Sequence, residues 1–325
     1  MAPCGMKVVV TGASGLLGRE VALSALRRGH HVVALGGSRE PRIPDVLRAM
    51  TIDLTDAAGL TGFMLDEFPD AVINCAALPS VEGCERDPAR AQSLNADLPA
   101  RLAELCFHVG GKLVHLSTDM VFDGEAAPYG HTSSPAPLSL YGRTKAAGEV
   151  AALKAGREHA AVVRTTLING NSPDGTRGLH ERLFRGLMKG ESMGLFTDEI
   201  RQPVGLTNLS DVLVELCERR ELSGVYHWAG AEALSRHEIA VRICGHFGLD
   251  AGLIVPTESA KAASSPPRPR NLALSLVPLA GKLKTPVQSF KDQLSELRVP
   301  RGCEEWYEAK TGRKVVRRLE KGLDY

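Results

Sequence analysis

Residues 7–18 read KVVVTGASGLLG, a short run of β-branched residues followed at once by three glycines spaced three residues apart. The run predicts a buried strand over Lys7–Thr11, and the next residues predict a helix over Leu16–Arg28 that ends near Gly29. Glycine is needed where a chain turns tightly and where a phosphate must approach the backbone, and a helix start presents unpaired N–H groups. This strand, turn and helix therefore indicate a binding site for the pyrophosphate of a dinucleotide.

Outward from this unit, short apolar runs alternate with amphipathic stretches through the first half of the chain, a pattern typical of repeated βα units and a parallel sheet. Further strands are expected at His31–Leu35, Met50–Asp53, Ala71–Cys75, Lys112–Ser117 and Ala161–Thr166. Further helices are expected at Leu60–Phe68, Pro88–Val109 and Leu140–Gly156. We predict an α/β fold, with a doubly wound parallel Rossmann sheet and a smaller α/β domain after it.

The alternation loosens after about residue 170, where prolines begin to interrupt it. We therefore expect an NADP-binding Rossmann domain over residues 1–170, which includes the catalytic helix, and a smaller substrate-binding domain over 171–300 that is interleaved with the first. Residues 301–325 are expected to form a basic C-terminal tail. Within the smaller domain we expect a strand at Gly224–Trp228 and helices at Leu209–Arg219 and Ser235–Phe247.

The composition favours a small-molecule partner. The 325 residues contain 39 Lys and Arg against 38 Asp and Glu, and a net charge of +1 creates no field that would attract nucleic acid or a membrane surface. The seven cysteines are scattered and never form a CxxC pair, so we expect no disulfide framework and no metal site. No export signal precedes Lys7 and no run of 18 apolar residues occurs, so a cytoplasmic location is expected.

The end of the second strand bears on the choice of cofactor. An acidic residue there would accept hydrogen bonds from a free ribose 2′-hydroxyl, but the chain has Gly36-Gly37-Ser38-Arg39. Because an arginine can pair with a 2′-phosphate, we expect Ser38 and Arg39 to bind NADP (as NADPH), and NAD is the less favoured cofactor. The alternative is that Arg39 is an exposed loop residue. Further cofactor contacts are expected at strand ends, from Asp53, Leu54, Cys75, Ala76 and Ala77.

The fifth strand ends in Ser117-Thr118-Asp119, and Tyr141-Gly142-Arg143-Thr144-Lys145 follows 23 residues after Thr118. On a helix, Tyr141 and Lys145 share one face a turn apart. A neighbouring ammonium stabilises a phenolate, so Tyr141 would give its proton to a developing alkoxide more readily. Thr118 would polarise the carbonyl, and Lys145 would also hold the ribose of the cofactor. This trio indicates ketone reduction.

Together these residues resemble the extended short-chain dehydrogenase/reductases, and within them the branch that contains dTDP-4-dehydrorhamnose reductase and the regulatory beta subunit of methionine adenosyltransferase. The segments that carry the resemblance are TGASGLLG (11–18), VINCAA (72–77), SLNADLPARLAELC (93–106), STDMVFDG (117–124), PAPLSLYGRTKAAGE (135–149) and RPRNLAL (268–274). The resemblance implies a nucleotide-sugar site between the two domains and reduction of a 4-keto group by NADPH or NADH. The predicted cofactor-binding residues are Gly12, Ser14, Gly15, Leu16, Leu17, Gly18, Ser38, Arg39, Asp53, Leu54, Cys75, Ala76, Ala77, Asn95, Tyr141 and Lys145.

The chain departs from the sugar reductases on the substrate side. Met120 and Leu167 stand where those enzymes tend to have aromatic residues, so a surface for stacking on a sugar is missing. His131–Ser134 replace acidic residues, which removes support for a magnesium-linked dimer. If the pocket takes its specificity from polar groups instead, the candidate substrate-binding residues are Asp119, Arg201 and Gln202.

The sequence therefore leads to an NADP(H)-dependent reductase of a nucleotide-linked 4-keto-6-deoxysugar. An alternative is a cofactor-binding regulatory subunit that docks on another enzyme and keeps the Thr/Tyr/Lys set. A third possibility is a sugar epimerase or dehydratase of the same fold, although a dehydratase would be expected to have an acidic pair beside Thr118. The polypeptide partner would be a second copy in a homodimer or an enzyme partner.

Overall fold

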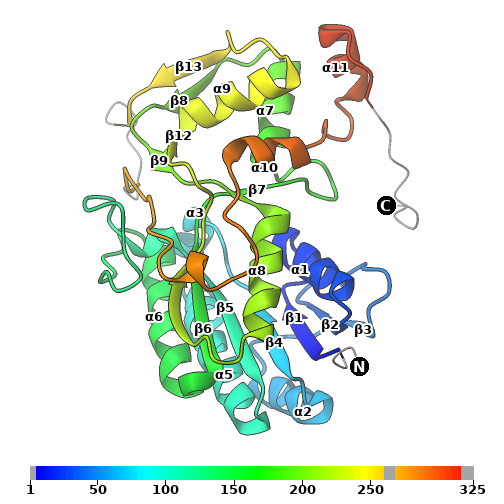
Figure 1. Cartoon of the computed structure of the whole chain (residues 1–325), viewed down its shortest axis with the longest axis vertical. Helices are drawn as coiled ribbons and strands as arrows, with labels where there is room; N and C mark the ends of the chain where they lie inside the picture. The colour runs from blue at the N-terminus through cyan, green and yellow to red at the C-terminus, as the bar shows by residue number, and fades with distance from the viewer. Residues whose placement is uncertain (1–4, 260–267, 316–325) are drawn as a thin grey trace.

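A parallel seven-stranded sheet forms the centre of the larger part of the protein (Figure 1). The computed structural model describes residues 5–259 and 268–315. Its strands are ordered β11-β6-β5-β4-β1-β2-β3, and the predicted doubly wound α/β fold is confirmed. Their bounds are β1 Lys7–Thr11, β2 His31–Gly36, β3 Arg48–Thr51, β4 Ala71–Asn74, β5 Lys112–Thr118, β6 Ala160–Thr165 and β11 Gly224–His227.

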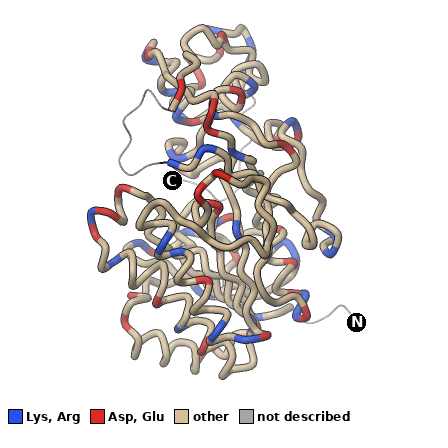
Figure 2. The backbone as a smooth tube through the Cα atoms, turned by 90° about the vertical axis from the view of Figure 1, so that its left-hand side faces the viewer, with Lys and Arg blue, Asp and Glu red and all other residues tan. Residues whose placement is uncertain are grey.

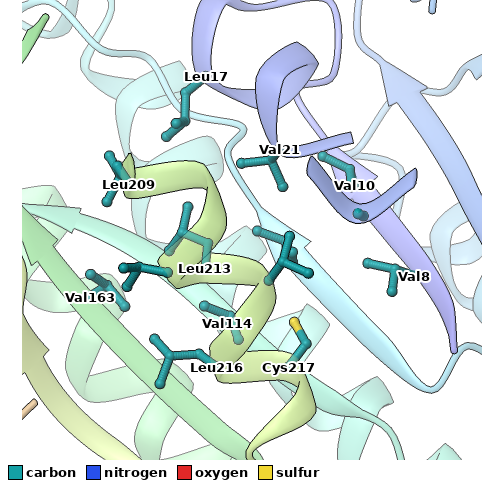
Figure 3. Close-up of a cluster of buried hydrophobic side chains, with 14 of the residues drawn as sticks. Val8, Val10, Leu17, Val21, Val114, Val163, Leu209, Leu213, Leu216 and Cys217 are labelled. Carbon is teal, nitrogen blue, oxygen red and sulfur yellow. The ribbon is translucent and has the colours of Figure 1, made fainter. Parts of the chain in front are cut away.

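Helices cover both faces of this sheet because its strands are apolar on both sides. On one face lie α1 (Leu16–Arg27) and α8 (Leu206–Glu218), which pack together. Leu209, Leu213 and Leu216 of α8 belong to one buried cluster with valines of the strands (Figure 3). The opposite face is covered by α2 (Ala57–Glu67), α5 (Leu98–Val109) and α6 (Leu140–Gly156).

The segment between β4 and β5 differs from the single helix predicted over Pro88–Val109. It consists of α3 (Val81–Arg86), α4 (Pro88–Gln92), one π-helical turn (Ser93–Asp97) and α5. Pro99 has no N–H with which to bond the carbonyl of Asn95, and its ring crowds that carbonyl, so the helix widens just before the proline. The predicted helix Leu60–Phe68 also begins earlier, at Ala57, because the Asp56 side chain accepts a hydrogen bond from the backbone nitrogen of Ala58 at 3.1 Å.

A smaller part lies beyond the carboxyl edge of the sheet, at the top of Figure 1. Its helices α7 (Leu179–Met188), α9 (Arg236–Phe247), α10 (Phe290–Glu296) and α11 (Glu304–Thr311) share an apolar core. Three short strand pairs join β10 (Val204–Gly205) to β7 (Ile168–Asn169), β12 (Leu234–Ser235) to β9 (Ile200–Arg201), and β13 (Ile254–Thr257) to β8 (Met193–Phe196). Short 3₁₀ turns occur at Asp119–Val121, Arg157–His159 and Leu279–Gly281.

Two elements that the sequence placed in the smaller domain belong to the larger part. Strand β11 extends the large sheet by pairing in parallel with β6, and α8 buries its apolar face between α1 and the sheet. Both were assigned to the smaller domain because they follow residue 170, but the chain returns to the sheet after α7. The division at residue 170 itself stays a prediction.

The C-terminal segment also differs from the predicted tail over 301–325. Residues 304–311 form α11, and its Tyr307 is 5% exposed and donates a hydrogen bond to the carbonyl of Phe247 at 3.0 Å. Residues 304–311 are therefore not part of a tail. Residues 316–325 lie outside the described residues.

Charged residues of both signs are interspersed along both parts of the chain (Figure 2). This mixture agrees with a net charge of +1. Across residues 5–259 and 268–315, no helix combines the length and the apolar character that crossing a membrane requires.

Candidate active site

A cavity of about 1020 Å³ opens at the carboxyl edge of the large sheet, where β1 and β4 are neighbours but the chain continues from them in opposite directions. Such a switch point is where open α/β sheets bind ligands. The predicted site residues that line it are Gly12, Ser14, Gly15, Leu16, Leu17, Gly18, Ser38, Asp53, Leu54, Cys75, Ala76, Ala77, Thr118, Tyr141 and Lys145. The predicted residues that it does not bring there are Arg39, Asn95, Asp119, Arg201 and Gln202.

The glycine turn forms one end of the cavity. Gly12 has a φ angle of +65°, and a Cβ atom on it would lie 2.8 Å from the backbone nitrogen of Ala76. A Cβ on Gly18 would lie 2.3 Å from the carbonyl oxygen of Gly12, so both positions require glycine. Gly15 begins α1 without a side-chain cap, and the first turn contains no acidic residue. Free helix N–H groups and an open backbone cradle fit the pyrophosphate of a dinucleotide cofactor.

The three candidate catalytic residues meet at the other end. Helix α6 begins where the Ser139 hydroxyl accepts a hydrogen bond from the backbone nitrogen of Gly142 at 3.1 Å, which places Tyr141 in the first turn and Lys145 in the next. Thr118 is the last residue of β5. Burial raises the pKa of Tyr141, and its hydrogen bond with Thr118 partly offsets that increase. The phenol is therefore a proton donor at neutral pH.

Lys145 is held in a buried position, with 2% of its surface exposed. Its Nζ donates a hydrogen bond to the carbonyl oxygen of Leu116 at 2.7 Å and lies 3.3 Å from Nε2 of His115. Burial lowers the pKa of Lys145 to about 8, and the charge of Glu149, one turn further along α6, works against this decrease. The amine is thus close to its titration point at physiological pH.

His115 belongs to a row of buried polar side chains that the sequence analysis missed. Thr11, Asn74 and His115 are register partners on the adjacent strands β1, β4 and β5. The Thr11 hydroxyl donates to Oδ1 of Asn74 at 2.6 Å, and Nδ2 of Asn74 lies 3.0 Å from Nδ1 of His115. Only the strand register reveals this row, since successive members are 63 and 41 positions apart in the chain.

Asp119 lies behind Thr118 rather than in the cavity. It is 5% exposed, and its Oδ1 accepts a hydrogen bond from the Thr118 hydroxyl at 3.1 Å. Burial raises the pKa of Asp119, and the nearby charge of Arg201 opposes that increase. In the described part of the chain, its Oδ2 atom finds no hydrogen-bond partner. The predicted contact of Asp119 with substrate stays a prediction; in the structure this side chain contacts Thr118.

Arg201 and Gln202 are occupied by internal hydrogen bonds. The Arg201 guanidinium donates to the carbonyl oxygens of Ile200, Pro269 and Arg270 at 2.7 to 3.1 Å. The Gln202 amide donates to the Gly230 carbonyl at 2.7 Å and accepts from the backbone nitrogen of Leu274 at 2.8 Å. These side chains join β9 and the residue after it to the loops around residues 230 and 269–274. A local sequence pattern does not show such contacts between distant segments.

Asn95 is likewise a connector and not a cavity residue. From the π-helical turn, its Oδ1 accepts a hydrogen bond from the backbone nitrogen of Leu78 at 2.9 Å, and its Nδ2 donates to Thr144 Oγ1 on α6 at 3.2 Å. It thereby joins the loop after β4 to the helix that carries Tyr141 and Lys145. The predicted contact of its side chain with the cofactor stays a prediction, and Asn95 does not line the cavity.

Arg39 lies next to the first cavity, in a second one of about 940 Å³. Ser14 and Arg177 line both cavities, so the two adjoin. Arg177 follows β7, far from the glycine motif in sequence, and no pattern near it indicated a role. Thr165, Thr166 and Ile168, which line the first cavity from the end of β6 onward, were missed for the same reason.

A buried ion pair supports the carboxyl ends of β5 and β6. The Arg164 guanidinium and the Glu149 carboxylate are 4% and 2% exposed, with Nη2 and Oε2 2.7 Å apart. Glu149 also accepts a hydrogen bond from Ser117, which lines the first cavity. Arg164 lies over the ring of Phe122 at 5.0 Å. The described residues contain no group of three or more His, Cys, Asp or Glu that could hold a metal ion.

A family profile and individual relatives both match this chain over most of its length. The profile of the RmlD substrate binding domain matches residues 6–299. The chain is 33% identical to the dTDP-4-dehydrorhamnose reductase of Mycobacterium tuberculosis over 91% of its own length and 93% of that protein. It is 33% identical to a probable low-salt glycan biosynthesis reductase of Haloferax volcanii (90% and 97% covered) and 32% identical to methionine adenosyltransferase 2 subunit beta of Xenopus laevis (82% and 79% covered).

Solved structures agree with this assignment. A dTDP-4-dehydrorhamnose reductase of Clostridium acetobutylicum superposes with a TM-score of 0.76 at 28% identity, covering 90% of this chain and 98% of that one. The dTDP-4-dehydrorhamnose reductase of Bacillus anthracis, solved in complex with NADP, superposes with a TM-score of 0.78 at 23% identity and covers 90% and 98%. The second likeness shows the fold.

Proposed function

The chain belongs to the RmlD substrate binding domain family, and from that premise we propose that it is an NADPH-dependent reductase of a nucleotide-linked 4-keto-6-deoxysugar. The family match confirms the resemblance inferred from the glycine turn and the Tyr/Lys helix. The observation that carries the proposal is that Thr118, Tyr141 and Lys145 line the same cavity as the glycine turn. A dinucleotide that reaches from the turn toward Tyr141 would bring its nicotinamide beside the ketone.

Each of the three residues has a distinct role in this reduction. The bound nicotinamide supplies the hydride. The Tyr141 phenol gives its proton to the oxygen of the former ketone, and the Thr118 hydroxyl bonds that oxygen as its negative charge develops. Lys145 in its charged form stabilises the phenolate that remains, and it binds the ribose of the cofactor. In the structure the single hydrogen of the Thr118 hydroxyl is donated to Asp119. That hydroxyl must therefore turn from Asp119 to the substrate oxygen when the ketone binds.

We expect NADPH to be preferred over NADH. Arg39 follows Ser38 after β2, where a Rossmann fold places the adenosine ribose, and residues 37–39 contain no acidic side chain that would accept from a free 2′-hydroxyl. NAD is the second choice. A calorimetric comparison of the two reduced cofactors tests this preference directly.

The test of the activity is a panel of nucleotide-linked 4-ketosugars assayed for consumption of NADPH. Steady turnover with one member identifies the substrate. The substrate would bind between the Rossmann part over residues 1–170 and the smaller part over 171–300, the two being interleaved. The protein is expected to act in the cytoplasm and as a homodimer or with an enzyme partner.

A regulatory role is the second candidate. The chain is 32% identical to methionine adenosyltransferase 2 subunit beta of Xenopus laevis over 82% of its length. In addition, Met120 and Leu167 are not aromatic and do not line the first cavity, so they offer no ring on which a sugar could stack. Under this alternative the protein binds NADPH, reduces no ketosugar in the panel, and is recovered in a stoichiometric complex with another enzyme. The complete Thr/Tyr/Lys set favours the reductase.

A further inference from the structure

The second cavity has an unusual lining. Five of its residues are arginines and two are acidic, and they come from helix α1, the loop after β2, the loop before α7 and the segment before α11. The arginines are Arg19, Arg39, Arg42, Arg177 and Arg301, and the acidic residues are Glu40 and Asp174. Segments about 260 residues apart in the chain thus converge on one basic hollow.

The arginines outnumber the two carboxylates of this cavity, and three of the five form no ion pair in the described residues. Arg177 pairs with Asp174 at 3.0 Å. By contrast, within residues 5–259 and 268–315 the guanidinium groups of Arg39, Arg42 and Arg301 form no ion pair with a carboxylate. Three uncompensated guanidinium groups around one cavity favour a multiply charged anion, and a phosphate monoester accepts the paired hydrogen bonds that guanidinium groups donate.

The two arginines of the C-terminal half are carried on backbone that is held in place. The Arg185 guanidinium donates hydrogen bonds to the carbonyl oxygen of Gly175 at 3.1 Å and to that of Arg301 at 3.2 Å, which ties the two segments together. The Ser172 hydroxyl accepts a hydrogen bond from the backbone nitrogen of Arg177 at 3.1 Å. The C-terminal wall of the hollow is therefore organised before any ligand arrives.

The order of residues after β2 indicates which phosphate group would occupy the second cavity. Gly37 and Ser38 line the first cavity and Arg39 lines the second, so the boundary between the cavities falls where a Rossmann fold places the adenosine ribose. A group attached to the 2′-oxygen of that ribose would project from the first cavity into the second. We propose that Arg177 and Arg301 join Arg39 in binding the 2′-phosphate of NADP.

The C-terminal half then contributes to the choice of cofactor, and the 2′-phosphate connects the loop after β2 to the segments around α7 and α11. This inference rests on the proposed function in that it takes the ligand to be the NADP of the reductase. It assigns specificity to residues outside the Rossmann motif, where no local pattern indicates a nucleotide contact.

The experiment measures binding to the full chain by calorimetry, with NADPH, NADH, adenosine 2′,5′-bisphosphate and 5′-ADP as the probes. Arg301→Ala and Arg177→Ala are each expected to weaken binding of the two ligands with a 2′-phosphate by about tenfold or more, since each change removes a charge-assisted hydrogen bond. Affinities for NADH and 5′-ADP should stay within about twofold of wild type, because they lack that phosphate. Arg182→Ala, an exposed arginine of α7 outside both cavities, is the matched control and should change nothing.

Two results would overturn the inference: unchanged affinity for adenosine 2′,5′-bisphosphate in both variants, or equal weakening of NADPH and NADH. An unchanged melting temperature shows that a variant is folded. Arg301→Lys keeps the charge but not the paired hydrogen bonds, so its affinity for NADPH should fall between those of wild type and Arg301→Ala. Failure of the proposed function looks different, because the wild-type protein would then bind NADPH and turn over no ketosugar, or bind no nucleotide at all.

Discussion

Nζ of Lys145 lies 3.3 Å from Nε2 of His115, and the surrounding hydrogen bonds settle which atom carries a proton. Oδ1 of Asn74 accepts the backbone N–H of Ala76 at 3.2 Å, so its Nδ2 donates to Nδ1 of His115. A neutral His115 therefore has its hydrogen on Nε2, directed at Lys145. Burial and the charge of Lys145 hold the pKa of His115 well below its ordinary value, which keeps the ring neutral. If Lys145 is an ammonium, it faces a second donor, the N–H at Nε2 of His115. If it is a neutral amine, it can accept the hydrogen bond from that N–H, so this contact favours the neutral amine.

Replacing His115 by glutamine should consequently raise the pKa of Lys145, because an amide oxygen can accept from the ammonium. The other titratable groups around Lys145 are Tyr141, Cys75, Cys84 and Glu149, and they are unchanged in the variant. Nuclear magnetic resonance of lysines labelled at Cε, titrated in both proteins, measures the shift. The same pKa in the two proteins would show that His115 only fills space.

The depressed pKa of Lys145 also predicts a pH dependence of stability. Between pH 8 and the ordinary lysine value of 10.5, the unfolded chain holds a proton that the folded protein has lost, so the free energy of unfolding rises with pH there. From pH 8 to pH 10, wild type should gain on the order of 2 kcal/mol relative to Lys145→Met. Urea unfolding at several pH values measures this, with exposed Lys154→Met as the control on the same helix. A pH-independent difference between wild type and Lys145→Met would contradict the assignment.

Arg39→Ala should weaken NADPH selectively. The loss of a charge-assisted contact with the 2′-phosphate costs about 1.5–3 kcal/mol of binding free energy, while NADH is unaffected. Calorimetry with both cofactors measures the two affinities. If NADPH and NADH bind to the variant as they do to wild type, Arg39 is an exposed loop residue after all.

Glu149→Gln should destabilise the fold strongly. The change leaves Arg164 buried without its carboxylate, and breaking such a pair typically costs about 3–5 kcal/mol. The double variant Glu149→Leu with Arg164→Met should recover much of that loss, because no charge is then left unpaired. Denaturant unfolding of wild type, Glu149→Gln and the double variant measures the three free energies of unfolding. A Glu149→Gln variant as stable as wild type would show that the ion pair contributes little to stability.

Local patterns were enough to predict the strand-turn-helix at residues 7–18 and the helix Leu140–Gly156, which the structure reproduces with the same bounds. Both depend on neighbouring residues only: β-branched runs, a glycine turn, and Ser139 as the cap. Strand ends were displaced by one or two residues, as at β3, where the predicted Met50–Asp53 is Arg48–Thr51.

What the sequence did not reveal depends on contacts between distant segments. Strand β11 joins the large sheet only because the chain returns after α7, and Arg177 reaches the cavities only through the packing of the C-terminal half. Arg201 was predicted to bind substrate, and the structure shows its guanidinium bonded to three backbone carbonyls, which no local sequence pattern indicates.

The central claim is that Tyr141 is the acid of a ketosugar reductase, and steady-state turnover of Tyr141→Phe tests it most directly. With NADPH and the accepted nucleotide 4-ketosugar, the variant should lose about 10²–10⁴-fold in turnover number, because the proton donor is gone while the ring remains. Its affinity for NADPH should be nearly unchanged. Turnover at the wild-type rate across the pH range would contradict the account, because the proton would then have to come from another group.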